Sequence, residues 1–143
     1  MIKRPPTDLE ILEEIYKSYY STFSSFSRKK PNRGTKVHVP IDIESIAKHF
    51  LVDPDIIFGR LYYHLEPKYG FAQPDGSKVH FFALQVGSDR HTVQFPLLAS
   101  VIADLREERN KHLVSTWISI AAIIISIISL TVSLIVPLLS GRH

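Results

Sequence analysis

Apolar residues fill a segment near the C-terminal end of the chain almost without a break. The segment 113–136 contains no charged residue and is rich in Ile, Leu and Val. Its 24 residues would form a helix about 36 Å long, enough to cross a hydrocarbon core of about 30 Å. A soluble core does not need so long a helix that is apolar on every side. The pattern predicts a transmembrane helix over residues 113–139 and a short tail, 140–143.

Small residues recur inside this segment at alternating steps of four and three. This spacing is a heptad repeat. Small side chains let two helix backbones approach closely, and hydroxyl groups can form hydrogen bonds between helices. We therefore expect a homo-oligomer that associates through Ser115, Ser119, Ala122, Ser126, Ser129 and Ser133. The alternative is that each hydroxyl bonds to the carbonyl four residues earlier in its own helix and needs no partner.

The charges that flank the apolar segment indicate its orientation. Arg106, Arg109 and Lys111 precede the segment, and only Arg142 follows it. Because basic flanks tend to stay on the cytosolic side, we expect a single-pass membrane protein with a cytosolic N-terminal domain. The basic N-terminus has no apolar run behind it, so we expect no signal peptide.

The hydrophobic pattern of the N-terminal part begins with a helix. Thr7 and Glu10 have the spacing of a capping box, and apolar residues then recur at helical intervals. These signals predict a helix from about Asp8 to Tyr20 or a little beyond. A polar loop follows, and residues 37–39 predict a short strand.

Two further helices have clear start signals. Asp42 can cap a second helix over residues 43–50. Asp53 followed by proline predicts a third helix over about 54–66, which Pro67 would end. The turn between these helices is short, so the pair has a helix-turn-helix pattern.

A β-hairpin and a fourth helix complete the N-terminal part. Residues 79–86 and 91–95 alternate in polarity around a turn at 87–90. The expected register sets Leu84 opposite Val93 and Phe82 opposite Phe95, which gathers these four apolar side chains on one face. We expect a juxtamembrane helix over 97–112 that continues directly into the transmembrane helix. Its side chains that face the core should be Leu98, Val101, Ile102 and Leu105.

The order helix, strand, helix, helix, strand, strand, helix resembles a winged-helix domain, and residues 41–95 carry the resemblance. Residues 43–50 resemble its second helix, with Ala47 as the small packing residue. Residues 53–55 resemble the start of a recognition helix, and 87–90 resemble the tip of the wing. The resemblance implies an α+β fold for residues 1–96. It also implies a third helix that enters the major groove of duplex DNA, with the hairpin touching the backbone.

Positive charge concentrates in one loop. The net charge is +3 and the pI about 9.2, which does not by itself indicate a nucleic-acid partner. The loop contains five cations between Ser24 and Val37, and no acid lies between Glu14 and Asp42, so the loop carries a local positive field. This loop suits phosphate, anionic lipid or simple solvation equally. The candidates for nucleic-acid or lipid contact are Arg28, Lys29, Lys30, Arg33, Lys36, Arg60, His64, Lys68 and Arg90.

The third helix carries few of the side chains that read DNA bases. Only Arg60, His64 and nearby Lys68 are donors of that kind. Tyr62 or Tyr63 must be partly exposed, because one helix cannot bury every side. An exposed aromatic face suits a protein partner at least as well as DNA.

Residues that support enzymatic chemistry are few. The chain has no cysteine, which excludes disulfides, thiolate zinc sites and cysteine nucleophiles. Its seven histidines lack metal-ligand spacing, and the sequence contains no nucleophile-elbow motif or phosphate-binding glycine loop. We expect a non-enzymatic protein without a cofactor.

Two functions remain for a membrane-anchored module of this kind. The first is a membrane-tethered regulator that binds duplex DNA. The alternative is an adaptor, or a small subunit of a membrane complex, that binds a cytosolic or membrane protein through the aromatic third helix. The surface of the folded domain distinguishes the two functions. DNA binding is favoured if the cations of the loop, the third helix and the hairpin share one face, and the adaptor is favoured if an apolar patch occupies that face.

Overall fold

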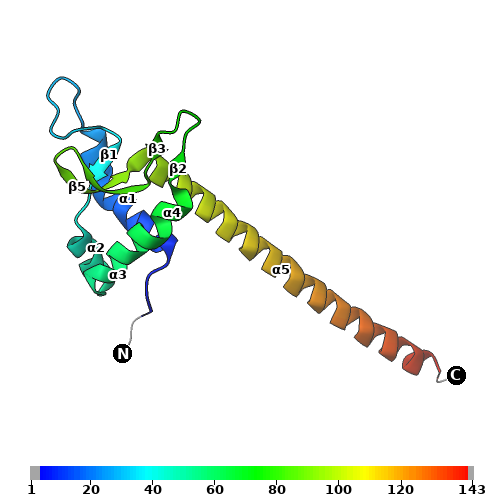
Figure 1. Cartoon of the computed structure of the whole chain (residues 1–143). Helices are drawn as coiled ribbons and strands as arrows, with labels where there is room; N and C mark the ends of the chain where they lie inside the picture. Colours follow the sequence, from blue (N-terminus) through cyan, green and yellow to red (C-terminus); the bar gives the residue numbers. More distant parts are fainter. Residues whose placement is uncertain (1–3, 142–143) are drawn as a thin grey trace. The chain divides into compact units, whose positions relative to one another are not determined.

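The structure is a computed structural model that describes residues 4–141, apart from the side chains of residues 138–140. The chain divides into two compact units, with the boundary between Leu105 and Arg106. The first unit is a small α+β domain, as predicted (Figure 1). The second unit is the rest of a long helix. The predicted tail falls mostly outside the described residues.

The first helix, α1 (Asp8–Ser24), begins at the predicted capping box. The Thr7 hydroxyl accepts the Glu10 backbone N–H at 3.3 Å, and the Glu10 carboxylate accepts the Thr7 N–H at 2.7 Å. Both bonds satisfy donors that a helix start leaves open. The apolar face of α1 buries Leu9, Ile11, Leu12 and Ile15.

The second helix, α2 (Ile43–Phe50), has the predicted bounds. The Asp42 carboxylate accepts the backbone N–H groups of Glu44 and Ser45 at 3.0 and 3.2 Å. The helix ends at Leu51, whose backbone is left-handed with φ of 55° and whose side chain is 74% exposed. Glycine favours this conformation, whereas a side chain with a Cβ is strained in it.

The third helical segment differs from its prediction. It consists of α3 (Pro54–Gly59), a π-helical turn η1 (Arg60–Leu65) and α4 (Glu66–Tyr69), so Pro67 does not end it. In η1 the Glu66 N–H donates to the Leu61 carbonyl, five residues earlier. This wider turn places Pro67 in the first turn of α4. The missing N–H of Pro67 costs little stability at this position, because the first turn of a helix leaves its N–H groups without partners inside the helix.

Three antiparallel strands form the main sheet, in the order β1 (His38–Pro40), β5 (Asp89–Gln94) and β4 (Phe82–Val86). The predicted hairpin register is wrong, because Phe82 pairs with Val93 rather than with Phe95. The turn is shorter than expected: Gly87 has a φ of 61°, and β5 already begins at Asp89. A slip of two residues preserves the faces of a strand, so Phe82, Val93 and Phe95 are still buried. Leu84, however, is 45% exposed.

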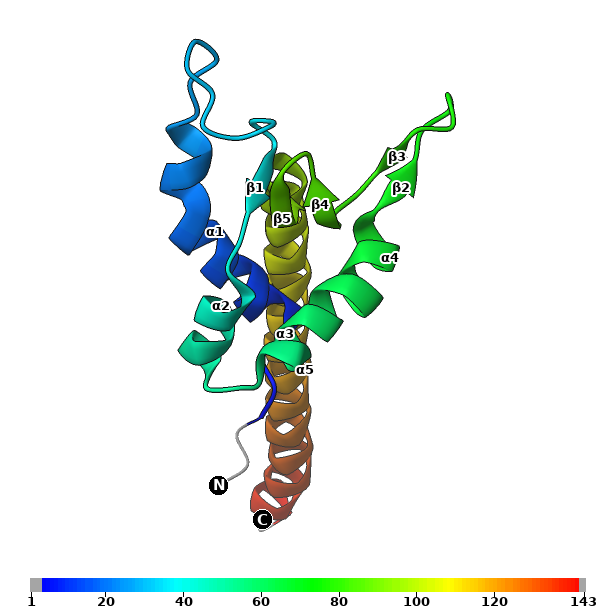
Figure 2. The same ribbon diagram turned by 60° about the vertical axis from the view of Figure 1, so that its left-hand side comes forward.

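A second, two-stranded sheet was not expected from the sequence. β2 (Phe71–Ala72) pairs with β3 (Lys78–Val79), so the strand predicted over 79–86 is interrupted before β4. The turn between them uses Gly76 with a φ of 84°, and the Asp75 carboxylate accepts the Ser77 N–H. Figure 2 shows this β2–β3 arm projecting away from the main sheet.

The core of the first unit lies between its helices and one face of the main sheet. Phe81, Phe82 and Phe95 are among its largest fully buried side chains. The start of α5 (Phe95–Ser140) supplies Leu98, Val101 and Ile102, as predicted, and Leu105 packs at the margin. The core therefore combines side chains from both ends of the first unit.

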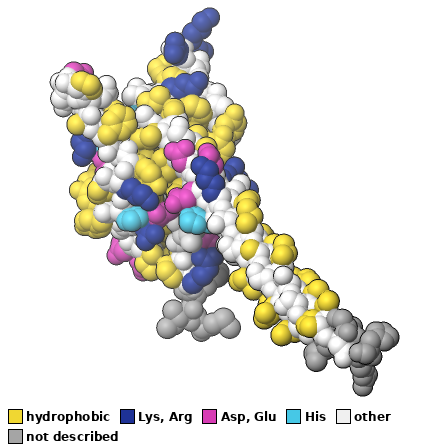
Figure 3. Space-filling model, turned by 90° about the vertical axis from the view of Figure 1, so that its right-hand side faces the viewer, with side chains coloured by type: hydrophobic (Ala, Val, Ile, Leu, Met, Phe, Trp, Pro, Cys, Tyr) yellow, Lys and Arg dark blue, Asp and Glu magenta, His cyan; other side chains and the backbone are white. Residues whose placement is uncertain are grey.

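The long helix α5 runs without interruption into the apolar segment, as predicted, and contains Pro137. Among the described residues, it is the one helix long and apolar enough to cross a membrane. In the second unit, apolar side chains cover much of the helix surface that Figure 3 shows. Their exposure would be costly in water and favourable in lipid.

The strained backbone at Leu51 leads to a stability prediction. We expect Leu51→Gly to raise the stability of the folded domain by about 1 kcal/mol, because glycine adopts a positive φ without steric cost. Lys48→Gly, inside the same helix, should instead lower stability by about 1 kcal/mol. Thermal unfolding followed by circular dichroism measures both, and a lower melting temperature for Leu51→Gly would contradict the prediction.

Candidate functional site

The candidate site is a groove of about 850 Å³ beside strand β4. One wall comes from η1 and α4, and the other from β4 and the residues that precede it. Its apolar lining includes Tyr62, Tyr63, Val79, Leu84 and Val86. Its polar lining includes His38, Glu66, Lys78, His80, Gln85 and Gln94.

The carboxylate of Glu66 joins the two walls of the groove. Its side chain is only 9% exposed and accepts the Phe82 backbone N–H at 2.8 Å. The His80 Nδ1 lies 2.6 Å from the same carboxylate, and the Lys78 Nζ lies 3.6 Å away. A buried carboxylate is stable only with such partners. Glu66 therefore fixes the start of β4 against α4.

The backbone of β4 presents an open edge to the groove. The Gln94 N–H donates to the Phe81 carbonyl, which orients the backbone groups of Phe81 and Ala83 toward β5. Backbone groups alternate along a strand, so those of Phe82 point the other way. At the far end of the strand, Val86 pairs with Asp89 across the two-residue turn. Glu66 takes the Phe82 N–H. In the described chain, β4 is an edge strand, and no strand pairs with its other side.

Aromatic residues form the opposite wall, and one of them is highly exposed. Tyr62 stacks on Phe58 with ring centroids 5.5 Å apart and is half-buried. Tyr63 meets Tyr62 edge to face at 5.0 Å and is 73% exposed. The expected exposure of one of these two tyrosines is confirmed.

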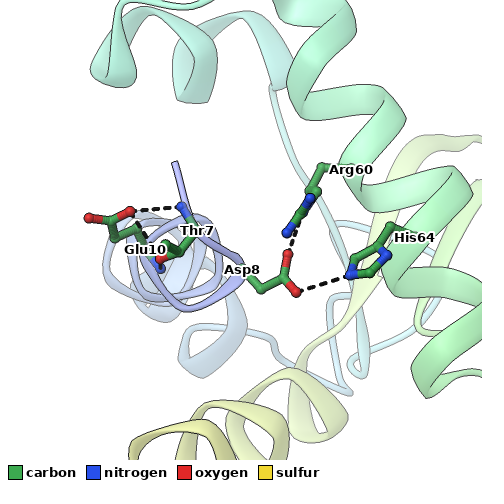
Figure 4. A network of polar contacts seen from close by, with 5 residues as sticks. All are labelled: Thr7, Asp8, Glu10, Arg60 and His64. Carbon is green, nitrogen blue, oxygen red and sulfur yellow. Dashed lines mark hydrogen bonds and ion pairs between the residues drawn. The ribbon is translucent and has the colours of Figure 1, made fainter. Parts of the chain in front are cut away.

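Two of the predicted contact residues on the third helical segment, Arg60 and His64, contact α1 instead. Figure 4 shows the Asp8 carboxylate between Arg60 and His64. The Arg60 Nε lies 2.5 Å from one Asp8 oxygen, and the His64 Nε2 lies 3.2 Å from the other. Asp8 therefore offsets the positive charge of Arg60, which the sequence predicts to contact DNA.

The basic loop lies at the tip of the β4–β5 hairpin. The Gly34 N–H donates to the Asp89 carboxylate at 3.2 Å, and Arg90 is exposed next to it. Arg28, Lys29 and Lys30 are exposed, and Figure 3 shows Lys and Arg side chains gathered on the loop at the top of the view.

Arg33 does not belong to this exposed set. It is 7% exposed and donates to the backbone carbonyls of Thr22, Thr35 and Lys36. Its guanidinium also lies 4.9 Å from the centre of the Phe26 ring. The side chain closes the loop onto the end of α1, so its donors are not available to a phosphate.

The predicted contact residues do not form one surface. Arg60 and His64 lie at the start of α1, whereas the loop lies beyond its end. The 17 residues of α1 separate these places by about 25 Å. Lys68 lies apart from both on α4, where its amine is 5.1 Å from the centre of the Tyr69 ring. Two exposed acids, Asp53 and Asp55, occupy the start of α3.

Several hydroxyls of the serine stripe bond within their own helix. Ser119 donates to the Ser115 carbonyl at 3.0 Å, and Ser126 donates to the Ala122 carbonyl at 2.8 Å. Ser133 donates to the Leu130 carbonyl at 3.2 Å. These bonds leave hydroxyl oxygens able to accept from another helix. The small side chains of the stripe remain exposed on the helix surface.

The residues that build the groove were mostly not foreseen. Glu66, Lys78 and the edge position of β4 depend on contacts between segments distant in sequence. The turn signal Pro74-Asp75-Gly76 could have revealed the arm that carries Lys78. Within residues 4–141, no cluster of three or more histidines or acids is placed to hold a metal ion.

Comparisons with known proteins give no relative. No family model, no curated protein and no solved structure matches this chain.

His38, in the groove lining, leads to a pH prediction. Burial, aided by the nearby His80, lowers the pKa of His38 below its ordinary value of 6.5. His38 therefore binds a proton more readily in the unfolded state than in the folded state. As the pH falls below about 6.5, this difference lowers the free energy of unfolding. We expect His38→Gln to gain stability relative to the wild type between about pH 7 and pH 5. Denaturant unfolding across this range tests it, and a stability difference that does not change with pH would contradict it.

Proposed function

We propose that this chain is a non-enzymatic, membrane-anchored adaptor that binds a protein partner through a winged-helix-like domain. The observation that carries the proposal is the groove beside β4, with Tyr63 exposed on one wall and an unpaired strand edge on the other. Exposed aromatic side chains beside a concave apolar surface are typical of protein-binding sites.

The order of the elements supports the winged-helix-like assignment. Helices α2 and α3 follow β1, and the β4–β5 hairpin then returns to pair with β1 through β5. This arrangement matches the order that motivated the resemblance. The β2–β3 arm is an addition between the third helical segment and the hairpin.

The charge distribution favours the adaptor over duplex DNA. A helix that enters the major groove needs free donors on its exposed side. Here Arg60 and His64 bond to Asp8, and the start of α3 exposes Asp53 and Asp55. These carboxylates would repel DNA phosphates, and the basic loop lies too far away to compensate for them.

The helix α5 would provide the membrane anchor. Its apolar segment supports a single span, and the basic residues before that segment support a cytosolic domain. The partner would then be a cytosolic protein or the cytosolic part of a membrane protein.

Photo-crosslinking tests the adaptor. A photoreactive phenylalanine in place of Tyr63, in the full chain in its native membrane, should crosslink to another polypeptide. The same probe at Tyr20, which is exposed on α1, should give much less product. Tyr63→Ala should also lower partner recovery about tenfold, because aromatic anchors dominate such interfaces. Equal crosslinking at the two positions, or none at Tyr63, would reject the adaptor.

We also propose that two copies associate through the serine stripe. Small residues permit close helix packing, and each interhelical hydrogen bond contributes about 0.6 kcal/mol. The association would be weak and reversible, and would bring two grooves together for bivalent binding.

Bulky substitutions test this association. Ser119→Leu and Ser126→Leu in the full chain should reduce crosslinked dimer in lipid vesicles several-fold, because leucine prevents close approach of the backbones. Ile120→Leu and Ile127→Leu, outside the stripe, serve as matched controls and should leave the dimer unchanged. Equal dimer in all four variants would contradict pairing through the stripe.

A further inference from the structure

We infer that the groove beside β4 binds an amphipathic α-helix of another protein, and that this helix carries carboxylates next to its apolar face. This step rests on the proposed adaptor function and specifies the secondary structure and the charge of the segment that the adaptor binds. Three properties of the groove carry it: main-chain groups that are already engaged, exposed apolar side chains on both walls, and an accessible cation.

The main chain of β4 does not offer a row of hydrogen-bond partners to an occupant. The outward N–H of Phe82 donates to Glu66 at 2.8 Å, and at its far end the strand closes on β5 where Val86 pairs with Asp89. An extended segment in this groove would place some of its own N–H and C=O groups against apolar side chains without partners, which costs free energy. A helix avoids this cost, because its backbone groups are already paired with each other.

Exposed apolar side chains lie on both walls of the groove. Tyr63 is 73% exposed on the helical wall, and Leu84 is 45% exposed on the strand wall. Pro67, four residues after Tyr63, and Val79 extend the apolar lining. An amphipathic helix presents apolar side chains at steps of three and four residues along one face, so it can contact both walls at once.

The accessible charge of the groove is positive. Among the described residues that line it, Glu66 is the one acid, and its side chain is 9% exposed. The side chain of Lys78, in contrast, is 57% exposed. The Lys78 amine lies 3.6 Å from Glu66, which is too far for a direct hydrogen bond, so it can still donate to a carboxylate of the occupant. Acidic residues beside the apolar face of the bound helix would complement this amine.

The described helices of this chain do not match such an occupant. In the first unit, α1, α2 and α3 bury apolar side chains in their own core, among them Ile11, Ile46 and Ile57. The apolar segment 113–136 of α5 contains no acid. The helix that fits the groove therefore belongs to another protein rather than to a second copy.

A peptide selection with the whole protein tests the inference. The full chain in lipid nanodiscs is presented to a displayed library of random peptides of about 20 residues, because shorter helices are marginal in water. We expect enriched peptides in which apolar residues recur at steps of three and four, with at least one Asp or Glu next to that face. Enriched peptides with apolar residues at every second position would overturn the inference.

A helix-breaking substitution in an enriched peptide distinguishes a bound helix from a bound extended segment. Proline at a central position, on the face away from the apolar residues, should weaken binding at least about tenfold, because it interrupts the helix. Alanine at the same position is the control and should leave binding unchanged. Equal affinity of the proline and alanine peptides would overturn the bound helix.

Matched leucine variants of the protein test whether the peptide binds in the groove. Leu84→Ala should weaken binding several-fold, because it removes an apolar contact from the strand wall. Leu51→Ala, at an exposed leucine outside the groove lining, is the control and should leave binding unchanged. Equal affinities of the two variants would place the peptide outside the groove and overturn the inference.

Neutralising the cation tests the predicted carboxylates. A selection repeated on Lys78→Gln should lose the enrichment of Asp and Glu, and glutamine avoids placing a second carboxylate beside Glu66. Lys17→Gln, on the exposed face of α1, is the control and should keep the acidic preference. Acidic enrichment that persists on Lys78→Gln would overturn the charge assignment.

The outcomes also separate this inference from the adaptor itself. A photo-crosslink at Tyr63 together with non-helical peptides, or without any enriched peptide, would retain the adaptor and overturn the bound helix. A crosslink from Tyr63 to a second copy of this chain would replace the partner protein by the chain itself. No enriched peptide and no crosslink at Tyr63 would reject both proposals.

Discussion

The buried carboxylate of Glu66 connects the parts of the domain on which the groove depends. It accepts the first outward N–H of β4, contacts His80 and lies near Lys78, so one side chain joins the third helical segment, the arm and the sheet. The backbone after α4 passes so close to Glu66 that residue 70 cannot carry a side chain. A Cβ at Gly70 would lie 2.7 Å from the Glu66 carbonyl oxygen, so only glycine permits this close return of the chain. This junction therefore helps to fix the distance between the two walls of the groove, together with the contact between the Phe58 and Phe82 rings.

Local signals in the sequence predicted the helices well. The capping box at Thr7 and the N-cap at Asp42 determine where α1 and α2 begin, and each acts through neighbours within three residues. The long apolar helix could be predicted for a similar reason, since its signal lies wholly within its own residues. The hairpin register could not. The true and predicted registers differ by two residues, and both place the same side chains on one face of the hairpin.

The candidate site was harder to predict, because distant contacts decide it. Arg60 is 52 residues from Asp8 in sequence, and nothing near Arg60 shows that its charge is offset. Arg33 looked like the other loop cations, yet three backbone carbonyls surround it. The exposed tyrosine of the third helix was predictable, because a helix with apolar residues on every side cannot bury them all. The charge pattern of the sequence therefore predicted more exposed cations than the folded domain has. The aromatic pattern correctly predicted an exposed tyrosine, which lies in the groove.

The π-helical turn has a consequence for how the third helical segment tolerates change. Ile57, Leu61 and Leu65 recur at every fourth residue and are all fully buried. In an α-helix, such a spacing drifts around the axis by about 40° at each step, and the wider turn of η1 reduces that drift. A π-helical turn holds one residue more than an α-helical turn, so deleting one residue of η1 would restore ordinary winding and leave Glu66 on nearly the same face, toward β4. The same deletion in the regular winding of α3 would instead rotate everything beyond it by about 100° and carry Glu66 away from β4.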